Sequence, residues 1–508
     1  MRARGLPRWI RGAMALLLCA LTLIFLLRFS PLGPWLSGRV VAPAAGPFPA
    51  GCRWREVHPK RSPPTFWEVR SYEYWHPSAS GLLPGRWSRA QPPECRPLAQ
   101  TSRLPAHWPA GGPRTEVTCD QASCHYRNLW YRGGHWYLLV DGEEPQKPWK
   151  MTHNHALQAL HVKSARSFAG NTRHVRVPGN SIFLDFVYFL HPTAIGHWPE
   201  LLFPLFSVLQ TSHADFQPDR VVVASLKKDH LFEWARTMLH LALGGKRGAS
   251  LPPLVWQTET KSVWTQILSP LEGVDPYEWV VFDSLLVVKD AEAGGFRAFQ
   301  TPELGQAFRA FVYNEYSLPL SPPPRARPFI TLLRKSSNRR ILNEGPLLEA
   351  LALLGDVRVA EFEAGTPMEA QLAAVAATDV LVSVHTSALA IAPLLRPGSV
   401  VLELLQRNWV YMDESFRAQT QSVGDLHHYA WRAVRPEEGS YLDARDELRF
   451  GNWTAADCNT EECVEAHTRV DVVVDVPRVY ELLKGRLDLV RSGASVAQAE
   501  APWPERGI

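Results

Sequence analysis

The chain has 508 residues, of which 46% are apolar and 20% are charged, and its formal net charge is +4. This composition is typical of a globular protein, and the length allows two or more domains. The charge is too small to argue for nucleic acid as a partner. No stripe of Lys and Arg interleaved with aromatic residues, no zinc-finger pattern and no RNP pattern is present in the sequence.

A short apolar segment near the N-terminus predicts a membrane anchor. Several arginines precede an uncharged run from Gly12 to Leu27. The run is just long enough for the thinner membrane of the endoplasmic reticulum (ER), and its basic flank should stay in the cytosol. We therefore expect a cytosolic tail (1–11), a transmembrane signal-anchor (12–28) and a luminal body, as in a single-pass type II protein of the ER or Golgi membrane. A cleaved signal peptide is the alternative, although no small-x-small cleavage site precedes Pro31.

Other features agree with an oxidising compartment in which proteins are glycosylated. One of the seven cysteines, Cys19, lies in the apolar run, and the other six form an even number, which is typical of disulfides. Two pairs are close enough in sequence for local bridges. Zinc is the alternative, but neither a Cys-x-x-Cys spacing nor a pair of histidines lies near them, so we expect no metal. The sequon that begins at Asn452 predicts a glycosylated surface loop. The disulfide candidates are Cys52, Cys95, Cys119, Cys124, Cys458 and Cys463.

Composition and periodicity divide the rest of the chain into segments. Residues 29–115 are rich in Pro, Gly and Trp and predict a stem that becomes an irregular N-terminal cap. Strand and helix patterns then alternate in two series, which implies an α/β protein with parallel, doubly wound sheets. Because a Pro-rich connector separates the series, we expect an N-terminal lobe (116–316), a C-terminal lobe (317–490) and a disordered tail (491–508).

The expected elements are as follows. The first series has short strands around a Gly-Gly turn at 133–134, strands over 182–190, 220–224 and 279–288, and helices over 196–209, 229–243 and 300–316. The second has strands over 329–333, 357–362, 380–384, 400–404 and 429–432, and helices over 343–354, 367–376, 388–395 and 476–489.

One strand–helix–strand unit carries polar residues that suggest a ligand site. The buried strand 380–384 is followed directly by His385-Thr386-Ser387 and then by the predicted helix 388–395. Ligands collect at the carboxyl ends of such strands, and the free N–H groups of a helix N-terminus favour phosphate. The alternative is that Thr386 or Ser387 only caps the helix and that His385 is an ordinary loop histidine.

A basic loop follows the strand 329–333. Two neighbouring strands of one sheet would aim this loop and the His385 turn at the same crevice, where Arg could bind a diphosphate in bidentate fashion. The alternative is a solvated basic loop. Glu403, at the end of the next strand, could accept hydrogen bonds from ribose hydroxyls or could be a buried acid paired with Arg396. The polar and basic residues of the loop are Arg334, Lys335, Ser337, Asn338, Arg339 and Arg340.

The first lobe offers a candidate general base. His197 opens the predicted helix 196–209, and the pKa of a histidine is close to neutrality. The alternative is a histidine that caps or packs the helix. Glu200 and Asp283 are weaker candidates for the same role.

Three of these stretches resemble glycosyltransferase family 61. The family's Arg-x-x-x-Arg-x-Ile-x-Asn segment is similar to Lys335-Ser-Ser-Asn-Arg-Arg-Ile-Leu-Asn343. Its Val-x-His-Gly-Ala-x-Leu segment is similar to Val384-His-Thr-Ser-Ala-Leu389, and its Pro-Gly-Ala-x-Val-x-Glu segment to Pro397-Gly-Ser-Val-Val-Leu-Glu403. One departure is Thr386 in place of the family's Gly, because a side chain there could crowd a diphosphate.

The resemblance implies a GT-B fold, with two Rossmann-like lobes that face a cleft, and an inverting transferase that uses UDP-sugars. UDP-GlcNAc is the first-choice donor, since the C-terminal lobe is most similar to family members that transfer GlcNAc to O-linked mannose, and UDP-xylose is the second. The acceptor, a glycan or glycoprotein, would enter near His197. The residues expected to bind the UDP-sugar are Arg334, Ser337, Asn338, Arg339, His385, Thr386, Ser387 and Glu403.

No cofactor is expected beyond the UDP-sugar as co-substrate. The sequence has no Asp-x-Asp motif, the carboxylate pair with which metal-dependent sugar transferases usually hold Mn²⁺ on the diphosphate. The charge of the leaving group would then be stabilised by arginine and by backbone dipoles. The alternative function is that of a catalytically inactive relative, a luminal glycan- or protein-binding module, and Thr386 is the residue that favours it.

Overall fold

The computed structural model describes much of the chain after residue 113 and one short strand before it. Two compact units, residues 1–64 and 65–508, make up the chain, and all described residues belong to the second. Several predicted features lie outside the described residues. These are the anchor (12–28), Cys52, Cys95 and most of the stem. Within the described part, no helix combines the length and the apolar character needed to cross a bilayer. The described residues are 100–103, 114–120, 122–141, 149–150, 159–165, 173–186, 195–224, 226, 228–257, 260–262, 265–266, 271–272, 274–275, 277–288, 297–321, 325–362, 365–409, 413–454, 457–458 and 460–504.

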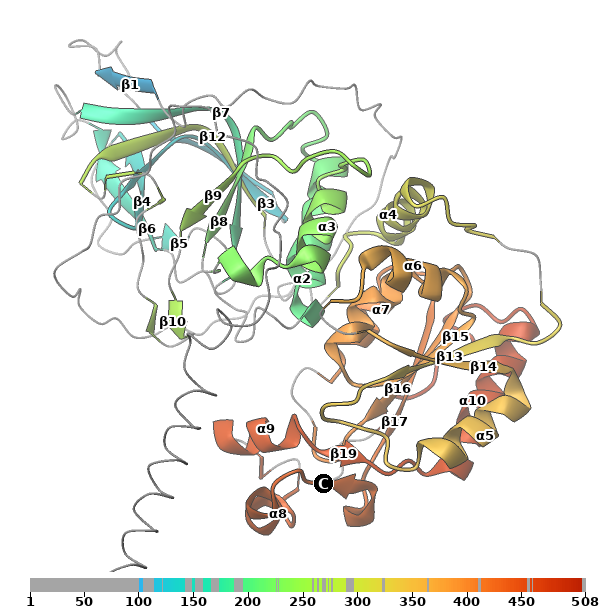
Figure 1. Cartoon of the computed structure of the whole chain (residues 1–508). Coiled ribbons are helices and arrows are strands. Elements are labelled where there is room, and N and C mark those ends of the chain that lie inside the picture. The colour runs from blue at the N-terminus through green and yellow to red at the C-terminus, as the bar shows by residue number, and fades with distance from the viewer. Residues whose placement is uncertain are drawn as a thin grey trace, which may run out of the picture. The chain divides into compact units, whose positions relative to one another are not determined.

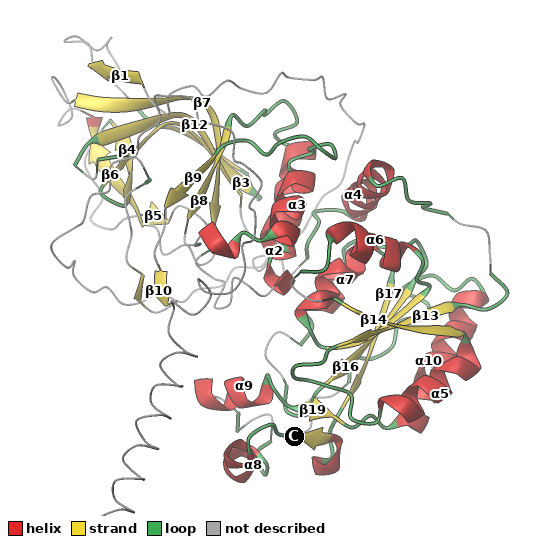
Figure 2. Ribbon diagram, in the orientation of Figure 1, coloured by secondary structure: helices red, strands yellow, loops and turns green. Residues whose placement is uncertain are grey.

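The first sheet has ten strands and mixes parallel with antiparallel pairs. Figure 2 shows the strands in yellow. Its strands are β1 (Gln100–Arg103), β2 (Glu116–Cys119), β3 (Ser123–Arg132), β4 (His135–Val140), β5 (Trp149–Lys150), β6 (Ala159–Ser164), β7 (Arg173–Asp185), β8 (Arg220–Ala224), β9 (Leu254–Gln257) and β12 (Trp279–Val288). The order is β5-β6-β4-β3-β12-β7-β8-β9, with β1 on β7 and β2 on β3. A separate pair consists of β10 (Thr260–Ser262) and β11 (Thr265–Gln266).

The prediction of a purely parallel first sheet is wrong for half of it. Strands β12, β7, β8 and β9 are parallel neighbours, whereas β3 is antiparallel to both β12 and β4. The reason lies in the turn between β3 and β4, where Gly133 and Gly134 have φ values of 58° and 90°. Two residues with positive φ close a tight hairpin, and a hairpin joins only antiparallel strands.

Two α-helices cover one face of the first sheet (Figure 1). They are α2 (Pro199–Gln210), which follows the short helix η3 (Ile195–His197), and α3 (Glu233–Ala242), which follows η4 (Lys228–His230). Residues alternate along β7, so that Ile182 and Leu184 pack in the same core as these helices and Phe183 packs in the core on the other face. Helix α2 is buried over almost its whole length, which fits its nearly continuous apolar sequence.

The second sheet is wholly parallel, as predicted. Its strands β13 (Phe329–Arg334), β14 (Asp356–Glu361), β15 (Val380–Val384), β16 (Val400–Leu405) and β17 (His427–Arg432) have the order β14-β13-β15-β16-β17. Residues of α5 (Glu344–Leu354) and α10 (Val476–Arg491) share a core with one face. Residues of α6 (Met368–Ala376), η6 (Ser387–Leu394) and α7 (Ser415–Gln421) share a core with the other face. Every residue of β15 and β16 is buried, which explains their unbroken apolar sequences.

Two expectations for this half of the chain need correction. The predicted α-helix over 388–395 is the 3₁₀-helix η6; the segment is short, and Pro393 has no backbone N–H with which to continue an α-helical ladder. Residues 492–504, expected to belong to a disordered tail, instead pack against the domain. Ala499 is buried, and the ring of Trp503 lies 5.0 Å from the guanidinium carbon of Arg417.

The remaining elements connect the sheets or lie beside the second one. Helix α4 (Pro302–Glu315) precedes β13, and a small C-terminal group comprises η7 (Pro436–Glu438), β18 (Gly439–Ser440), α8 (Ala444–Phe450), α9 (Glu461–His467) and β19 (Asp471–Val472). Strands β18 and β19 pair antiparallel. The predicted local bridges are both present, as the disulfides Cys119–Cys124 and Cys458–Cys463.

Candidate functional site

The candidate site lies where the strand order of the second sheet reverses. Strands β13 and β15 are neighbours, and the helices that follow them, α5 and η6, pack on opposite faces of the sheet. In open parallel sheets, ligands bind beyond the carboxyl ends of the strands at such a switch point. Both predicted ligand segments are there, because the basic loop begins at Arg334, the last residue of β13, and His385-Thr386-Ser387 follows β15.

Two arginines of the basic loop are paired with acids. Arg334 Nε donates to Oε2 of Glu344 at 2.9 Å. Arg340 binds Asp471 through Nε at 2.8 Å, through Nη2 at 2.6 Å and through its backbone N–H at 2.7 Å. Arg334 is therefore not poised to bind phosphate as predicted, because its guanidinium is paired with the carboxylate of Glu344.

Arg339 differs from these two because, in the described part of the chain, no carboxylate pairs with it. Its Nη1 donates to the backbone carbonyl of His385 at 2.7 Å, and its buried Nε has no hydrogen-bond partner there. Burial lowers the pKa of Arg339 to about 10, so the group stays cationic at neutral pH. Its backbone φ of 53° is costly for a long side chain, and such conformations gather at ligand sites. A desolvated cation without a counter-charge favours an anionic ligand.

Two further side chains of the loop add to this character. Burial and the nearby charge of Arg339 lower the pKa of Lys335, whereas Glu361 acts in the opposite direction. Asn338 has a buried Oδ1 that no donor among the described residues reaches, and Ser337 is exposed. The loop therefore presents two cations and an unsatisfied acceptor, which suit an anion that also carries hydroxyl or N–H donors.

His385 is held by a buried carboxylate. Its Nδ1 lies 2.5 Å from Oε1 of Glu403, and Nε2 of His428 lies 2.9 Å from Oε2. Burial alone would raise the pKa of Glu403, but the charges of His385 and His428 and their hydrogen bonds outweigh this effect and lower it to about 2. The predicted ribose contact of Glu403 does not fit its complete burial. The alternative partner, Arg396, binds Asp379 instead.

Aromatic rings complete the setting of the His385 turn. The centroid of the His385 ring lies 5.3 Å from that of Trp409 and 5.0 Å from that of Phe416. Thr386 is buried and extended, and its side chain makes no capping hydrogen bond to η6. The ring of His385 is thus fixed on one edge by Glu403 and flanked by two aromatic side chains.

The predicted base, His197, lies close to the His385 turn because Gly196, the residue before it, packs against Ser387. A Cβ on Gly196 would lie 3.1 Å from both Cα of Ser387 and Cζ of Phe416, so η3 and η6 are in close contact. His197 Nδ1 lies 3.2 Å from Oε1 of the buried Glu200, and its side chain is 31% exposed. A partly exposed imidazole that a carboxylate orients has the setting of a general base.

Other predicted residues lie elsewhere. Asp283 pairs with Arg176 at 2.5 Å and lines a separate pocket of about 570 Å³ beside His125 and His213. Asn452 is exposed, as a glycosylated residue must be.

Sequence reasoning missed His428, Trp409 and Phe416. The only signal for His428 was a pair of histidines at the start of an apolar strand. The two aromatic residues lie in segments without periodicity, so no pattern pointed to them.

Residues 190–402 match the family model described as Glycosyltransferase 61. The match covers less than half of the chain, and within it the sequence is similar to glycosyltransferase family 61. No curated protein sequence gives a significant match.

The region matched by the glycosyltransferase 61 model contains most of the site. It begins shortly before Gly196 and His197 and contains the basic loop and the His385 turn, and it ends at Leu402, one residue before Glu403. It therefore takes in parts of both sheets, including β13, β15 and the first half of β16. The family supports a sugar donor and a glycan acceptor as the two substrates.

Proposed function

We propose that the chain is an inverting, metal-independent glycosyltransferase that moves a sugar from UDP to a glycan or glycoprotein acceptor. The observation that carries the proposal is Arg339, a cation without a carboxylate partner among the described residues, which contacts the His385 turn at the switch point of the parallel sheet. The match to glycosyltransferase 61 supplies the class of reaction.

The diphosphate of the donor fits the charges of the basic loop. Arg339 and Lys335 would bind the phosphate oxygens, and the backbone N–H groups at the start of η6 would add further donors. Both cations lose solvation in the free protein, as the lowered pKa values of both groups indicate. An anion would remove this cost, and the same charges would stabilise the UDP that leaves.

His197 is the proposed base of one displacement. It would take the proton of the acceptor hydroxyl while the oxygen forms a bond to the anomeric carbon and the bond from that carbon to UDP breaks. The configuration of the carbon inverts, and the negative charge passes to the diphosphate. Glu200, 3.2 Å from His197 Nδ1, would orient the ring and stabilise its protonated form.

GlcNAc is the first-choice sugar and xylose the second, both from the resemblance of the C-terminal segments. We also propose a GT-B arrangement in which the first sheet carries the acceptor side and the second the nucleotide side. A type II anchor at 12–28 would place this enzyme in the lumen of the ER or Golgi. The two disulfides and the exposed sequon at Asn452 support such a compartment.

The first experiment is a thermal unfolding series on the full chain with UDP, UDP-GlcNAc and UDP-xylose, each with and without EDTA. A ligand that binds only the folded protein raises the unfolding midpoint. We expect UDP to raise it equally with and without EDTA, and the true donor to raise it more than the other sugar nucleotide. No shift with any nucleotide at millimolar concentration would contradict the proposal and favour an inactive relative. A shift that EDTA abolishes would contradict the metal-independent mechanism.

A further inference from the structure

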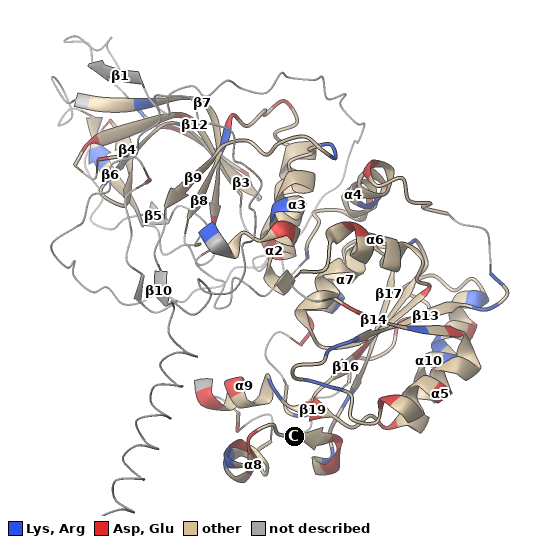
Figure 3. Cartoon of the chain, viewed as in Figure 1, with Lys and Arg blue, Asp and Glu red and all other residues tan. Residues whose placement is uncertain are grey.

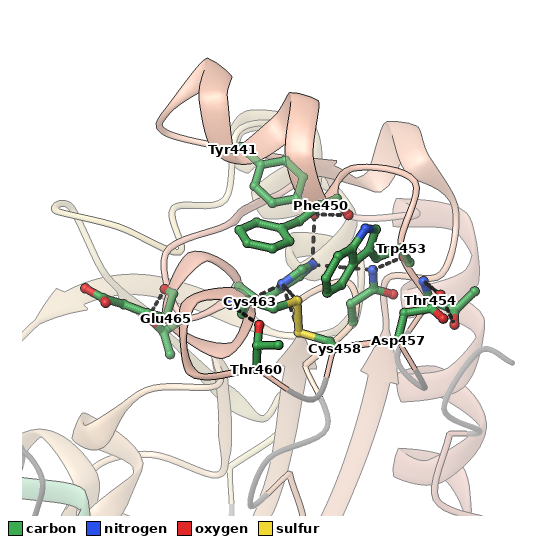
Figure 4. The surroundings of a disulfide bond; sticks show 12 residues. Tyr441, Phe450, Trp453, Thr454, Asp457, Cys458, Thr460, Cys463 and Glu465 are labelled. Atoms are coloured by element: carbon green, nitrogen blue, oxygen red, sulfur yellow. Dashed lines mark hydrogen bonds between the residues drawn. A yellow bond between two sulfur atoms is a disulfide. The ribbon is translucent and has the colours of Figure 1, made fainter.

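The C-terminal group of small elements contains a disulfide in an apolar setting. Cys458 and Cys463 form a core with Phe450 and Ala466, against which Tyr441 and Trp453 pack. Figure 4 shows the bond with Tyr441, Phe450 and Trp453 around it. Both cysteines are buried, so the bond lies inside the packed core of this group.

A histidine faces both sulfur atoms. His467 lies one turn after Cys463 on α9, and its Nδ1 is 3.3 Å from Sγ of Cys463 and 3.4 Å from Sγ of Cys458. The three side chains form the one group of potential metal ligands found in the described part of the chain. A tetrahedral zinc ion with bonds of about 2.3 Å to sulfur and about 2.0 Å to nitrogen has S···N edges of roughly 3.5 Å. The observed separations are close to this edge.

The other edge of the imidazole has the partner that a metal ligand needs. His467 Nε2 lies 2.8 Å from the hydroxyl of Tyr441, and that hydroxyl donates to the carbonyl of Phe450 at 3.3 Å. The Tyr441 oxygen can therefore accept a hydrogen bond from Nε2–H, which leaves the lone pair of Nδ1 directed at the sulfurs. Metal-binding histidines are usually oriented by such an outer hydrogen bond. In the alternative tautomer, Nδ1–H donates to the carbonyl of Cys463 at 2.8 Å.

We propose that Cys458, Cys463 and His467 form a redox-dependent site for a thiophilic divalent cation, with Zn²⁺ as the cation that fits best. In the oxidised protein the two sulfurs are joined. A dithiol or phosphine reductant gives two electrons to the S–S bond, two protons complete the thiols, and the reductant itself is oxidised. The cation then binds two thiolates and His467 Nδ1 and releases the two thiol protons to solvent. A water molecule would complete the tetrahedron.

The position of this site suggests what it controls. Asp471 follows α9 and holds Arg340 by three hydrogen bonds, and the Leu342 N–H donates to the carbonyl of Val472 at 2.9 Å. The segment from Cys458 to β19 therefore holds the end of the basic loop in place through these hydrogen bonds. Either the disulfide or the bound cation would restrain the conformation of this segment, whereas the reduced form without metal would lack that restraint.

The experiment uses Co²⁺ as a spectroscopic probe on the full chain. We expect visible d–d bands and a thiolate-to-cobalt charge-transfer band after reduction with a phosphine, displacement of both by Zn²⁺, and neither in the oxidised protein. Zn²⁺ should also raise the thermal midpoint of the reduced protein but not that of the oxidised one. His467→Ala should remove the bands, and Tyr441→Phe should weaken cobalt affinity by about 10- to 100-fold.

Matched variants separate this site from the other thiols. Cys119→Ser with Cys124→Ser removes the second described disulfide and should leave the cobalt spectrum unchanged, whereas Cys458→Ser with Cys463→Ser should abolish it. Near-ultraviolet circular dichroism checks that each variant is folded. The proposal would be overturned if folded, reduced protein with titratable thiols gave no cobalt spectrum, or if His467→Ala bound cobalt as tightly as the wild type.

Discussion

Adjacent arginines in the basic loop have opposite surroundings. Arg340 has a carboxylate partner in Asp471, whereas Arg339 has only the carbonyl of His385 among the described residues. A carboxylate partner is what we expect of an arginine that stabilises the fold. A cation without such a partner is what we expect of an arginine that binds an anionic ligand. The contrast gives a matched pair for mutation.

We predict that Arg339→Asn weakens UDP binding by about 10- to 100-fold, the loss expected for one charge-assisted contact. Asn tolerates the positive φ of this position, so the fold should be kept. Arg340→Gln should do the reverse, with UDP affinity close to normal and a lower unfolding midpoint, because the buried Asp471 loses its partner. Isothermal titration with UDP and thermal unfolding test both variants. Equal loss of UDP affinity in the two would refute the assignment of Arg339.

The buried Glu403 predicts a pH dependence of stability. The carboxyl has an ordinary pKa near 4.5 when unfolded and a pKa of about 2 when folded. A depressed folded pKa stabilises the protein above the unfolded pKa, and this contribution is lost as the pH falls through the folded one. Glu403→Gln should therefore cost about 3 kcal/mol at pH 6, and its difference from wild type should shrink between pH 4.5 and pH 2. Urea unfolding across this range measures it, and a pH-independent difference would contradict the ionised pair.

At the scale of elements, the contact between η3 and η6 determines how close the base lies to the donor. A Cβ on Gly196 would be crowded, because it would lie 3.1 Å from Cα of Ser387 and from Cζ of Phe416. The Phe416 ring can move, but the backbone of Ser387 cannot move without shifting the His385 turn. The glycine thus favours this close packing, and its backbone conformation is not unusual.

We predict that Gly196→Ala lowers kcat/KM slightly and that Gly196→Val lowers it by about tenfold or more, because displacements of the order of 1 Å can cost about 100-fold in rate. Gly485→Ala is the control: this residue lies inside α10 with no atom near its virtual Cβ. Alanine there should stabilise the protein by about 1 kcal/mol without affecting the rate. Steady-state kinetics with the donor identified by thermal shift test the series. Normal kcat/KM for Gly196→Val would show that this contact does not position the base.

Much of the element pattern of the second lobe could be predicted from the sequence. The strand 380–384 agrees with the structure because it is a short apolar run bounded by polar residues, and the predicted helix over 476–489 corresponds to α10. The first sheet was harder, since β3 and β12 pair over a separation of more than a hundred residues and periodicity carries no information about strand partners.

The site was predicted as a region and not as a set of contacts. Its two loops were identified because both follow buried strands, and the switch point brings them together. The individual pairs of Arg334 with Glu344 and of Glu403 with His428 depend on side chains that are distant in sequence or on other elements. Residue types alone could not decide which arginine keeps its charge unpaired.

At the scale of the whole second unit, one apolar core includes residues from both sheets. It contains Val221 of β8 and Leu381 of β15, together with residues of α2, α3, α6 and η6. Helix α4 contributes to it and also contacts the C-terminal end of η6. The ring of Phe308 lies 4.8 Å from that of Phe206, whereas Tyr313 Oη donates to the carbonyl of Leu394 at 2.8 Å. We therefore expect this unit to unfold in one cooperative transition.

The buried guanidinium of α4 tests this expectation. Arg309 Nη1 donates to Oδ1 of Asp425 at 2.8 Å and to the carbonyl of Leu395 at 3.0 Å, and its side chain is 2% exposed. Arg309→Met leaves both acceptors without their donor, so we predict a loss of roughly 2–3 kcal/mol in unfolding free energy. Lys228→Met, which removes an exposed pair with Glu272, should change it by less than about 0.5 kcal/mol. Calorimetry should show one transition for wild type and Lys228→Met, at a lower midpoint for Arg309→Met. An equal decrease of the midpoint in the two variants would contradict the prediction that the buried pair of Arg309 and Asp425 contributes more to stability than the exposed pair of Lys228 and Glu272.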